Sequence, residues 1–170
     1  MQAVRTLITK SEQISSPLRA VYEHWDKDRN EMFAPSWNSF SIEKLSRQLL
    51  PWAVVVDPVG DDFLIRLWGT RRCEVQGEQT GNMVSELKPL DLGEKVRWKY
   101  KDTLLARMPI LYETHVIRPH VTVDFMILRR PLSSDGEVVD RLVGVVDYGA
   151  VKGSLYDFYD VERPLYLDRY

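Results

Sequence analysis

Phe63-Leu-Ile-Arg-Leu-Trp-Gly-Thr-Arg-Arg-Cys-Glu-Val-Gln-Gly77 is the segment that indicates the fold most clearly, and after Glu78 it continues with Gln79-Thr80-Gly81. Its first half alternates between two faces that both carry large apolar residues, which predicts a strand in a sheet covered on both sides. Gly69 then marks a turn, and the polar residues after it are typical of short helical pieces and loops. A buried strand therefore runs into a compact, irregular connection.

The chain on either side of this stretch predicts an α+β domain with a five-stranded antiparallel sheet. Residues 52–56 form an apolar run that we pair with residues 62–68, across a hairpin loop of four or five residues. Three further strands are expected at 110–117, 121–129 and 138–148. Asp91 and Glu94 have the spacing of a capping box, which predicts a longer helix over about 92–107.

Two helices are expected before the sheet. Ser16 and Pro17 are suited to begin a helix of about 15 residues, and Ser41 is placed to cap a second, short one. The apolar stripe of the first helix either covers the domain's own sheet or forms a dimer seam; it consists of Leu18, Val21, Tyr22 and Trp25. We divide the chain into an N-terminal helical extension (1–50), a core (51–150) and an aromatic C-terminal tail (151–170).

Composition excludes several classes of function. The 170 residues suit one domain, and a formal charge of −2 gives no field that would attract nucleic acid or an anionic membrane. No apolar run is long enough for a membrane-spanning helix, and Met1 to Lys10 lack the features of an export signal. A single cysteine excludes an internal disulfide, so the cytoplasm is the expected location.

The ordered spacing of several short motifs resembles the PAS domains, and in particular small bacterial PAS-like proteins. The motifs are Trp25, Pro35-Ser36, Leu50-Pro51, Phe63, Arg66, Gly69-Thr70, Gly77 and Thr80-Gly81. Trp37 departs from the pattern where the family usually has a basic residue, and Gln79 where it usually has an acidic one. The resemblance implies a sensory or signalling module without its own output domain, not an enzyme, that forms a homodimer and binds a small molecule or a signalling protein.

The candidate ligand pocket lies between sheet and helices. A cation among apolar neighbours needs a partner, so Arg66 is expected either to pair internally with Glu74 or Glu86, or to line an anion-tolerant pocket. The residues assigned to that pocket are Arg66, Trp68, Arg72, Cys73, Tyr100 and Phe125. No haem or flavin signature is present, so the cofactor is unknown, and Cys73 is interpreted as a small buried hydrophobe.

Two rival functions remain open. The tail is rich in Tyr and Phe alternating with acids, which suits a protein-interaction scaffold without a ligand. Alternatively, a small α+β cavity enzyme would use His115 and Asp124 for proton transfer, with Glu113 on the same face and Asp147 joining across the second hairpin. His115 and His120 are not expected to bind metal, because a turn separates them.

Overall fold

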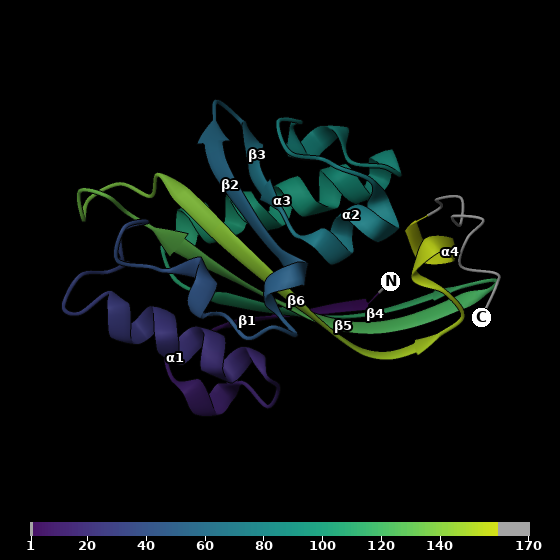
Figure 1. Cartoon of the computed structure of the whole chain (residues 1–170), viewed down its shortest axis with the longest axis horizontal. Coiled ribbons are helices and arrows are strands. Elements are labelled where there is room, and N and C mark those ends of the chain that lie inside the picture. Colours follow the sequence, from purple (N-terminus) through teal and green to yellow (C-terminus); the bar gives the residue numbers. More distant parts are fainter. Residues whose placement is uncertain (1, 160–170) are drawn as a thin grey trace.

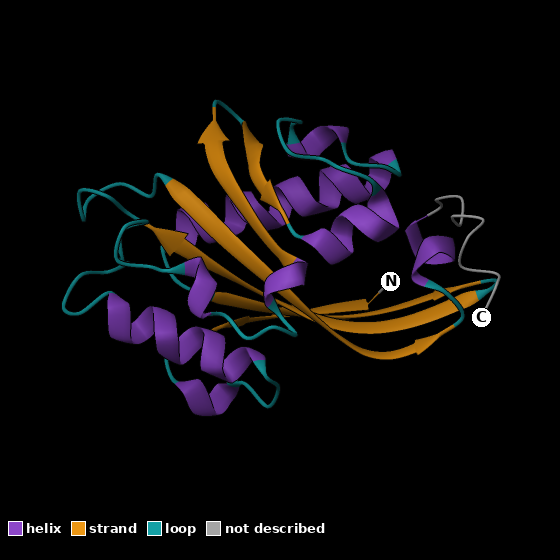
Figure 2. Ribbon diagram, in the orientation of Figure 1, coloured by secondary structure: helices purple, strands orange, loops and turns teal. Residues whose placement is uncertain are grey.

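The computed structural model describes residues 2–159, and its described elements form a mixed α+β fold around one antiparallel sheet (Figures 1 and 2). The strands are β1 (Gln2–Leu7), β2 (Ala53–Val59), β3 (Asp62–Trp68), β4 (Ile110–Arg118), β5 (Val121–Leu132) and β6 (Arg141–Lys152). The α-helices are α1 (Leu18–Asp28), α2 (Thr70–Gln76), α3 (Leu90–Ala106) and α4 (Leu155–Tyr159). Single 3-10 turns cover Ser11–Gln13, Ile42–Lys44, Leu50–Trp52 and Val84–Glu86.

The sheet has the order β1-β4-β5-β6-β2-β3. The α+β class and the succession of two strands, a helical connector and three strands are confirmed, but the expected count of five strands is wrong. The sixth strand is β1, which pairs antiparallel with β4 from Gln2↔His115 to Leu7↔Ile110. The first segment therefore belongs to the sheet, as its edge strand, although its sequence QAVRTL shows no regular alternation.

Helices cover both faces of the sheet, α1 on one and α2 with α3 on the other (Figure 1). The stripe of α1 is buried against Val55, Leu111, Leu128 and Val143, so these helix residues cover the chain's own sheet. The indole Nε1 of Trp25 donates a hydrogen bond to the Pro131 carbonyl at 2.8 Å and so ties α1 to β5. On the opposite face, Tyr100 of α3 packs with Phe63, Ile65 and Trp68.

The β2–β3 hairpin is tighter than expected. Pairing continues to Val59↔Asp62, so the loop is the two residues Gly60 and Asp61 rather than four or five. Gly60 has φ +59°, the left-handed conformation that such a loop requires. Pro58 is tolerated inside β2 because the pairing of β2 with β6 extends only over residues 53–56.

A β-bulge changes which residues of β3 face the core. The register shifts between Val55 and Val56, so that Val55 faces Leu67 and Val56 faces Ile65, and Arg66 has no cross-strand partner. A bulge interrupts strict alternation. As a result Trp68 joins Phe63 and Ile65 in one cluster, whereas the sequence pattern placed it on the opposite face.

The helix caps also differ from expectation. Asp91 does not cap α3, whose N-cap is Pro89; Asp91 instead forms an ion pair with Lys95 at 2.8 Å, and Glu94 pairs with Arg97 at 3.0 Å. The helix expected after Ser41 is only the single turn Ile42–Lys44, because Leu45 is already extended. In the tail, α4 lies at the far end of β4–β6 (Figure 1), while Tyr166 and Tyr170 lie outside the described residues.

Candidate functional site

A cavity of about 230 Å³ lies between α3 and the sheet, and residues of α2 and α4 also line it. Its lining combines aromatic and aliphatic side chains with five cationic ones. The apolar part includes Val54, Trp68, Val84, Leu87, Tyr100, Phe125, Ile127, Phe158 and Tyr159. The cations are Arg72, Lys95, Lys99, Arg118 and Arg129, and the single carboxylate of the described lining is Asp91.

Arg129 lies on β5 and is 2% exposed. Its guanidinium carbon is 4.6 Å from the centre of the Tyr100 ring and 5.2 Å from that of Tyr112. Its Nε and Nη1 atoms are buried without a hydrogen-bond partner, and no carboxylate of the described residues forms an ion pair with it. Burial lowers the pKa of Arg129, and the neighbouring tyrosines oppose that effect. Two aromatic faces thus contact a cation whose Nε and Nη1 donors are unfilled.

Arg130, the next residue, also has two buried nitrogens without a partner, Nε and Nη2, but it occupies the other face of the sheet. It is also fully buried, but it points to the α1 face, where its Nη1 donates to the Val21 carbonyl at 3.0 Å and its guanidinium lies 5.0 Å from the Phe40 ring. Successive residues of a strand face opposite sides, so of these two buried arginines only Arg129 lines the cavity.

Lys99 is the second buried cation of the cavity. It is 9% exposed, and its ammonium lies 5.0 Å from the centre of the Tyr112 ring. Burial, together with the charge of Arg129, lowers its pKa to about 8. The nearby carboxylate of Asp102 already has two other partners: it forms an ion pair with Arg5 at 2.5 Å and accepts a hydrogen bond from the Tyr112 hydroxyl at 2.6 Å.

The other cations line the same cavity. Arg72 lies 4.9 Å from the Trp68 ring and donates to the Trp52 carbonyl at 3.1 Å. Arg118 lies 5.2 Å from the Phe158 ring and donates to the Phe158 carbonyl at 2.7 Å. Both arginines are held by rings and carbonyls rather than by carboxylates. Only Lys95 among the cavity cations has an acid, Asp91, as its partner in the described chain, so the cavity lining carries a net positive charge.

Gly144 of β6 makes room for this arrangement. A Cβ at this position would lie 2.9 Å from the Tyr100 hydroxyl and 3.7 Å from Cγ of Arg129. The absence of a side chain therefore lets the ring and the guanidinium pack directly over the strand.

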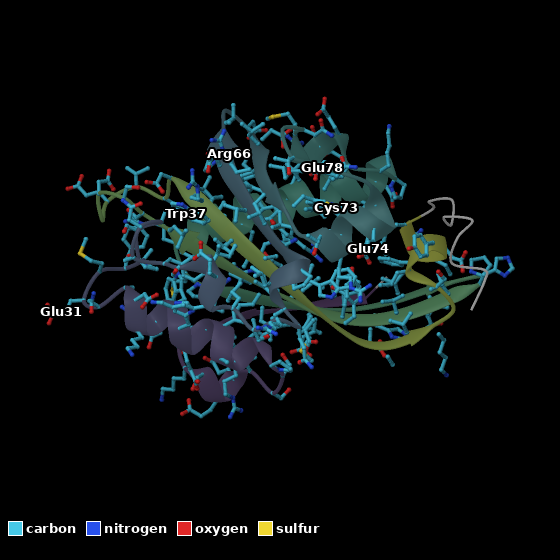
Figure 3. The ribbon with its side chains drawn as sticks, in the orientation of Figure 1. Glu31, Trp37, Arg66, Cys73, Glu74 and Glu78 are labelled. Carbon is cyan, nitrogen blue, oxygen red and sulfur yellow. The ribbon has the colours of Figure 1, made fainter. Side chains whose placement is uncertain are left out.

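Four of the six residues assigned to the pocket from the sequence line the cavity: Trp68, Arg72, Tyr100 and Phe125. Arg66 does not, because the bulge turns it outward. Its side chain is 54% exposed and pairs with Asp57 at 3.3 Å, not with Glu74 or Glu86. Figure 3 shows Arg66 on the β2–β3 hairpin, well separated from Glu74 on α2.

Cys73 does not line the cavity either. It packs at the edge of the α3-side cluster, with its Sγ near the Trp68 carbonyl at 3.6 Å and Glu78 at 3.4 Å. Burial and, as a smaller effect, the contact with Glu78 raise the pKa of the Cys73 thiol, which disfavours the reactive thiolate.

A second, open hollow of about 440 Å³ lies on the other face of the sheet, the face that carries α1. The polar residues suggested for an enzyme meet there: Glu113, His115, Asp124 and Asp147. His115 faces Asp124 across the β4–β5 ladder, and their side chains are in contact, although both are about half exposed. Burial raises the pKa of Asp147. The described residues contain no group of His, Cys, Asp and Glu arranged to hold a metal ion.

Two of the buried cations that line the cavity without an acid partner in the described chain, Lys99 and Arg129, were not identified from the sequence. A signal for one of them was present: Arg129-Arg130 interrupts an apolar strand between Leu128 and Pro131, deep in the sheet rather than at a loop. Arginine at consecutive strand positions must place one cation on each face. Lys99 has no such signal, because lysine in an amphipathic helix is ordinarily solvated.

Comparisons with known proteins assign this chain to no family. No protein-family model matches the chain, and no curated protein matches it significantly. One similar solved structure is described as "Flavin Analogue Sheds Light on Light-Oxygen-Voltage Domain Mechanism"; it is 18% identical, the match covers 64% of this chain and 80% of that chain, and the TM-score is 0.37. A match this weak supports no inference about function, which has to come from the strand order and the cavity of this chain. Within residues 2–159, no helix is long and apolar enough to cross a membrane.

Proposed function

We propose that this protein is a PAS-type sensory module that binds a small organic anion in the cavity between α3 and the sheet. The observation that carries the proposal is Arg129, a buried guanidinium with unfilled donors that lines a cavity. A buried cation without an acid is costly, and a carboxylate in the cavity offsets that cost. Ligand pockets that are mostly apolar with a few polar anchors are the usual form of small-molecule site.

The cavity also limits the ligand. At about 230 Å³ it is smaller than the roughly 300–1,000 Å³ of typical drug-sized sites. Its aromatic lining, with Trp68, Tyr100 and Phe125, favours a flat apolar body. We therefore expect a small monocarboxylate with one ring, held by its carboxylate at Arg129.

Calorimetric titration tests this proposal with two matched probes, 3-phenylpropionate and its uncharged amide, 3-phenylpropanamide. We expect the acid to bind at one site per chain and the amide to bind at least about 10-fold more weakly, because a hydrogen bond to a charged group is worth about 1.5–3 kcal/mol. Equal binding of acid and amide, or binding of neither, would contradict the proposal.

Arg130→Met serves as the matched control for Arg129→Met, since it removes an adjacent buried arginine that faces α1 instead of the cavity. This variant should bind the acid as the wild-type chain does. Native mass spectrometry of freshly purified protein provides an independent measurement, because it reports a co-purified acid and the oligomeric state together; the expected homodimer is tested by the same spectrum.

A further inference from the structure

Lys99 has an environment unlike that of the other lysines on α3. Lys95 pairs with Asp91 at 2.8 Å, and Lys101 pairs with Asp61. Lys99 is nearly buried, lines the cavity, and has no acid partner within residues 2–159. Its ammonium lies over the Tyr112 ring, the same ring that Arg129 contacts. A molecule held by Arg129 is therefore close to an amine that no salt bridge occupies.

The environment favours the nucleophilic form of this amine. Burial and the charge of Arg129 lower the pKa of Lys99 to about 8, whereas an ordinary lysine has a pKa of about 10.4. At neutral pH roughly a tenth of Lys99 is then the neutral amine, far more than for a solvated lysine. A desolvated lysine beside another cation is the arrangement that activates an amine toward carbonyl carbons.

We propose that Lys99 forms a reversible Schiff base with an oxo acid whose carboxylate is held by Arg129. This inference rests on the proposed function, and it narrows the ligand class to small acids that also carry a ketone or aldehyde. The neutral amine adds its lone pair to the carbonyl carbon and one of its protons moves to the oxygen. The second N–H proton then moves to the resulting hydroxyl, which leaves as water when the C=N bond forms. Amine and carbonyl give imine and water, so no oxidant or reductant takes part.

The placement of two anchors explains why a sensor would use such a bond. A 230 Å³ cavity offers limited contact area, so a simple small acid gains little affinity from burial alone. A covalent but reversible bond at Lys99 adds affinity only for acids that carry a carbonyl at the correct distance. The pair Lys99 and Arg129 would thus separate oxo acids from the plain acids of the same shape.

Reductive trapping tests the inference. The full chain is incubated with phenylpyruvate and sodium cyanoborohydride, which reduces an imine to a stable secondary amine, and the adduct is located by peptide mass spectrometry. We expect one adduct per chain, on Lys99, at least about 10-fold more abundant than on Lys101, because Lys101 is paired with Asp61 and does not line the cavity. Lys99→Arg should abolish this adduct, and Lys101→Met should leave it unchanged.

The uncharged ethyl ester of phenylpyruvate and Arg129→Met probe the carboxylate anchor; each should reduce trapping at Lys99 by about 10-fold or more. Labelling spread over the exposed lysines, or an adduct that survives Lys99→Arg, overturns the inference. 3-Phenylpropionate, the same acid without the ketone, distinguishes a failure of the Schiff-base inference from a failure of the proposed anion site. If it binds but phenylpyruvate is not trapped at Lys99, the Schiff base is wrong and the anion site stands; if it does not bind, the proposed function itself is wrong.

Discussion

Arg129→Met should weaken anion binding without weakening the fold. Methionine has nearly the reach of arginine and no charge, so it fills the space beside Tyr100 and Tyr112 without a buried cation. Replacing buried charges by apolar residues of similar volume is often neutral or stabilises by about 1–4 kcal/mol. The two ring contacts of Arg129, at 4.6 and 5.2 Å, oppose this gain, because each cation–π contact is worth about 0.5–2 kcal/mol.

The two ring contacts together are worth about 1–4 kcal/mol, the same size as the gain, so Arg129→Met should change the stability of the empty protein little. Urea denaturation followed by tryptophan fluorescence measures the free energy of unfolding, and calorimetry measures the affinity for 3-phenylpropionate. The affinity should fall about 10- to 150-fold, as expected when a charged hydrogen bond is lost. A variant that is destabilised by more than about 3 kcal/mol, or that binds the acid as tightly as the wild-type chain, would contradict this prediction. Arg66→Met is the surface control, since it removes an exposed ion pair of about 0–1 kcal/mol and should change neither measurement strongly.

Three further predictions concern the same region. Lys99 has a folded-state pKa of about 8, below the ordinary lysine value of 10.5, so the unfolded chain binds more protons between these values and stability should rise as pH increases from 8 toward 10. The full effect is about 3 kcal/mol; Lys99→Met should remove this rise in pH-dependent urea titrations, and an unchanged slope would contradict the burial of the amine. Gly144→Ala places a Cβ 2.9 Å from the Tyr100 hydroxyl, so we expect a loss of about 1–3 kcal/mol of stability together with weaker acid binding; normal binding would show that the ring has room to move. Gly69→Ala places a Cβ 2.2 Å from the Pro51 carbonyl oxygen, which is backbone, and should cost at least about 4 kcal/mol in thermal or urea unfolding, whereas a stable variant would show that this close approach is absent.

The sequence was a good guide where periodic patterns decide the structure. Alternation in β4 and β5 correctly placed Glu113, His115 and Asp124 on one face of the sheet. The pattern of alternation failed at β3, because a β-bulge shifts the register there and no residue pattern in this segment predicts the bulge. Arg66 therefore faces solvent, and the buried cation expected there lies elsewhere.

The site itself could be predicted only in part. The aromatic lining follows from large apolar residues at core positions, so Trp68, Tyr100 and Phe125 were found. The charged anchors depend on which strand faces which helix, and that is a property of the assembled sheet. Arg129 and Arg130 have the same residue type and the same burial, yet one lines the cavity and the other contacts the α1 backbone. The placement of Lys99 likewise depends on the side of α3 that meets Tyr112.

The central claim is that Arg129 anchors an organic anion in the α3 cavity. A crystal structure of the protein with 3-(4-bromophenyl)propionate tests it most directly, because the bromine locates the ligand by its anomalous signal. We expect the carboxylate within hydrogen-bond distance of the Arg129 guanidinium, at about 2.7–2.9 Å, with the bromophenyl ring among Trp68, Tyr100 and Phe125. A ligand found only in the hollow beside His115 and Asp124, or a cavity that stays empty at saturating acid, would contradict it.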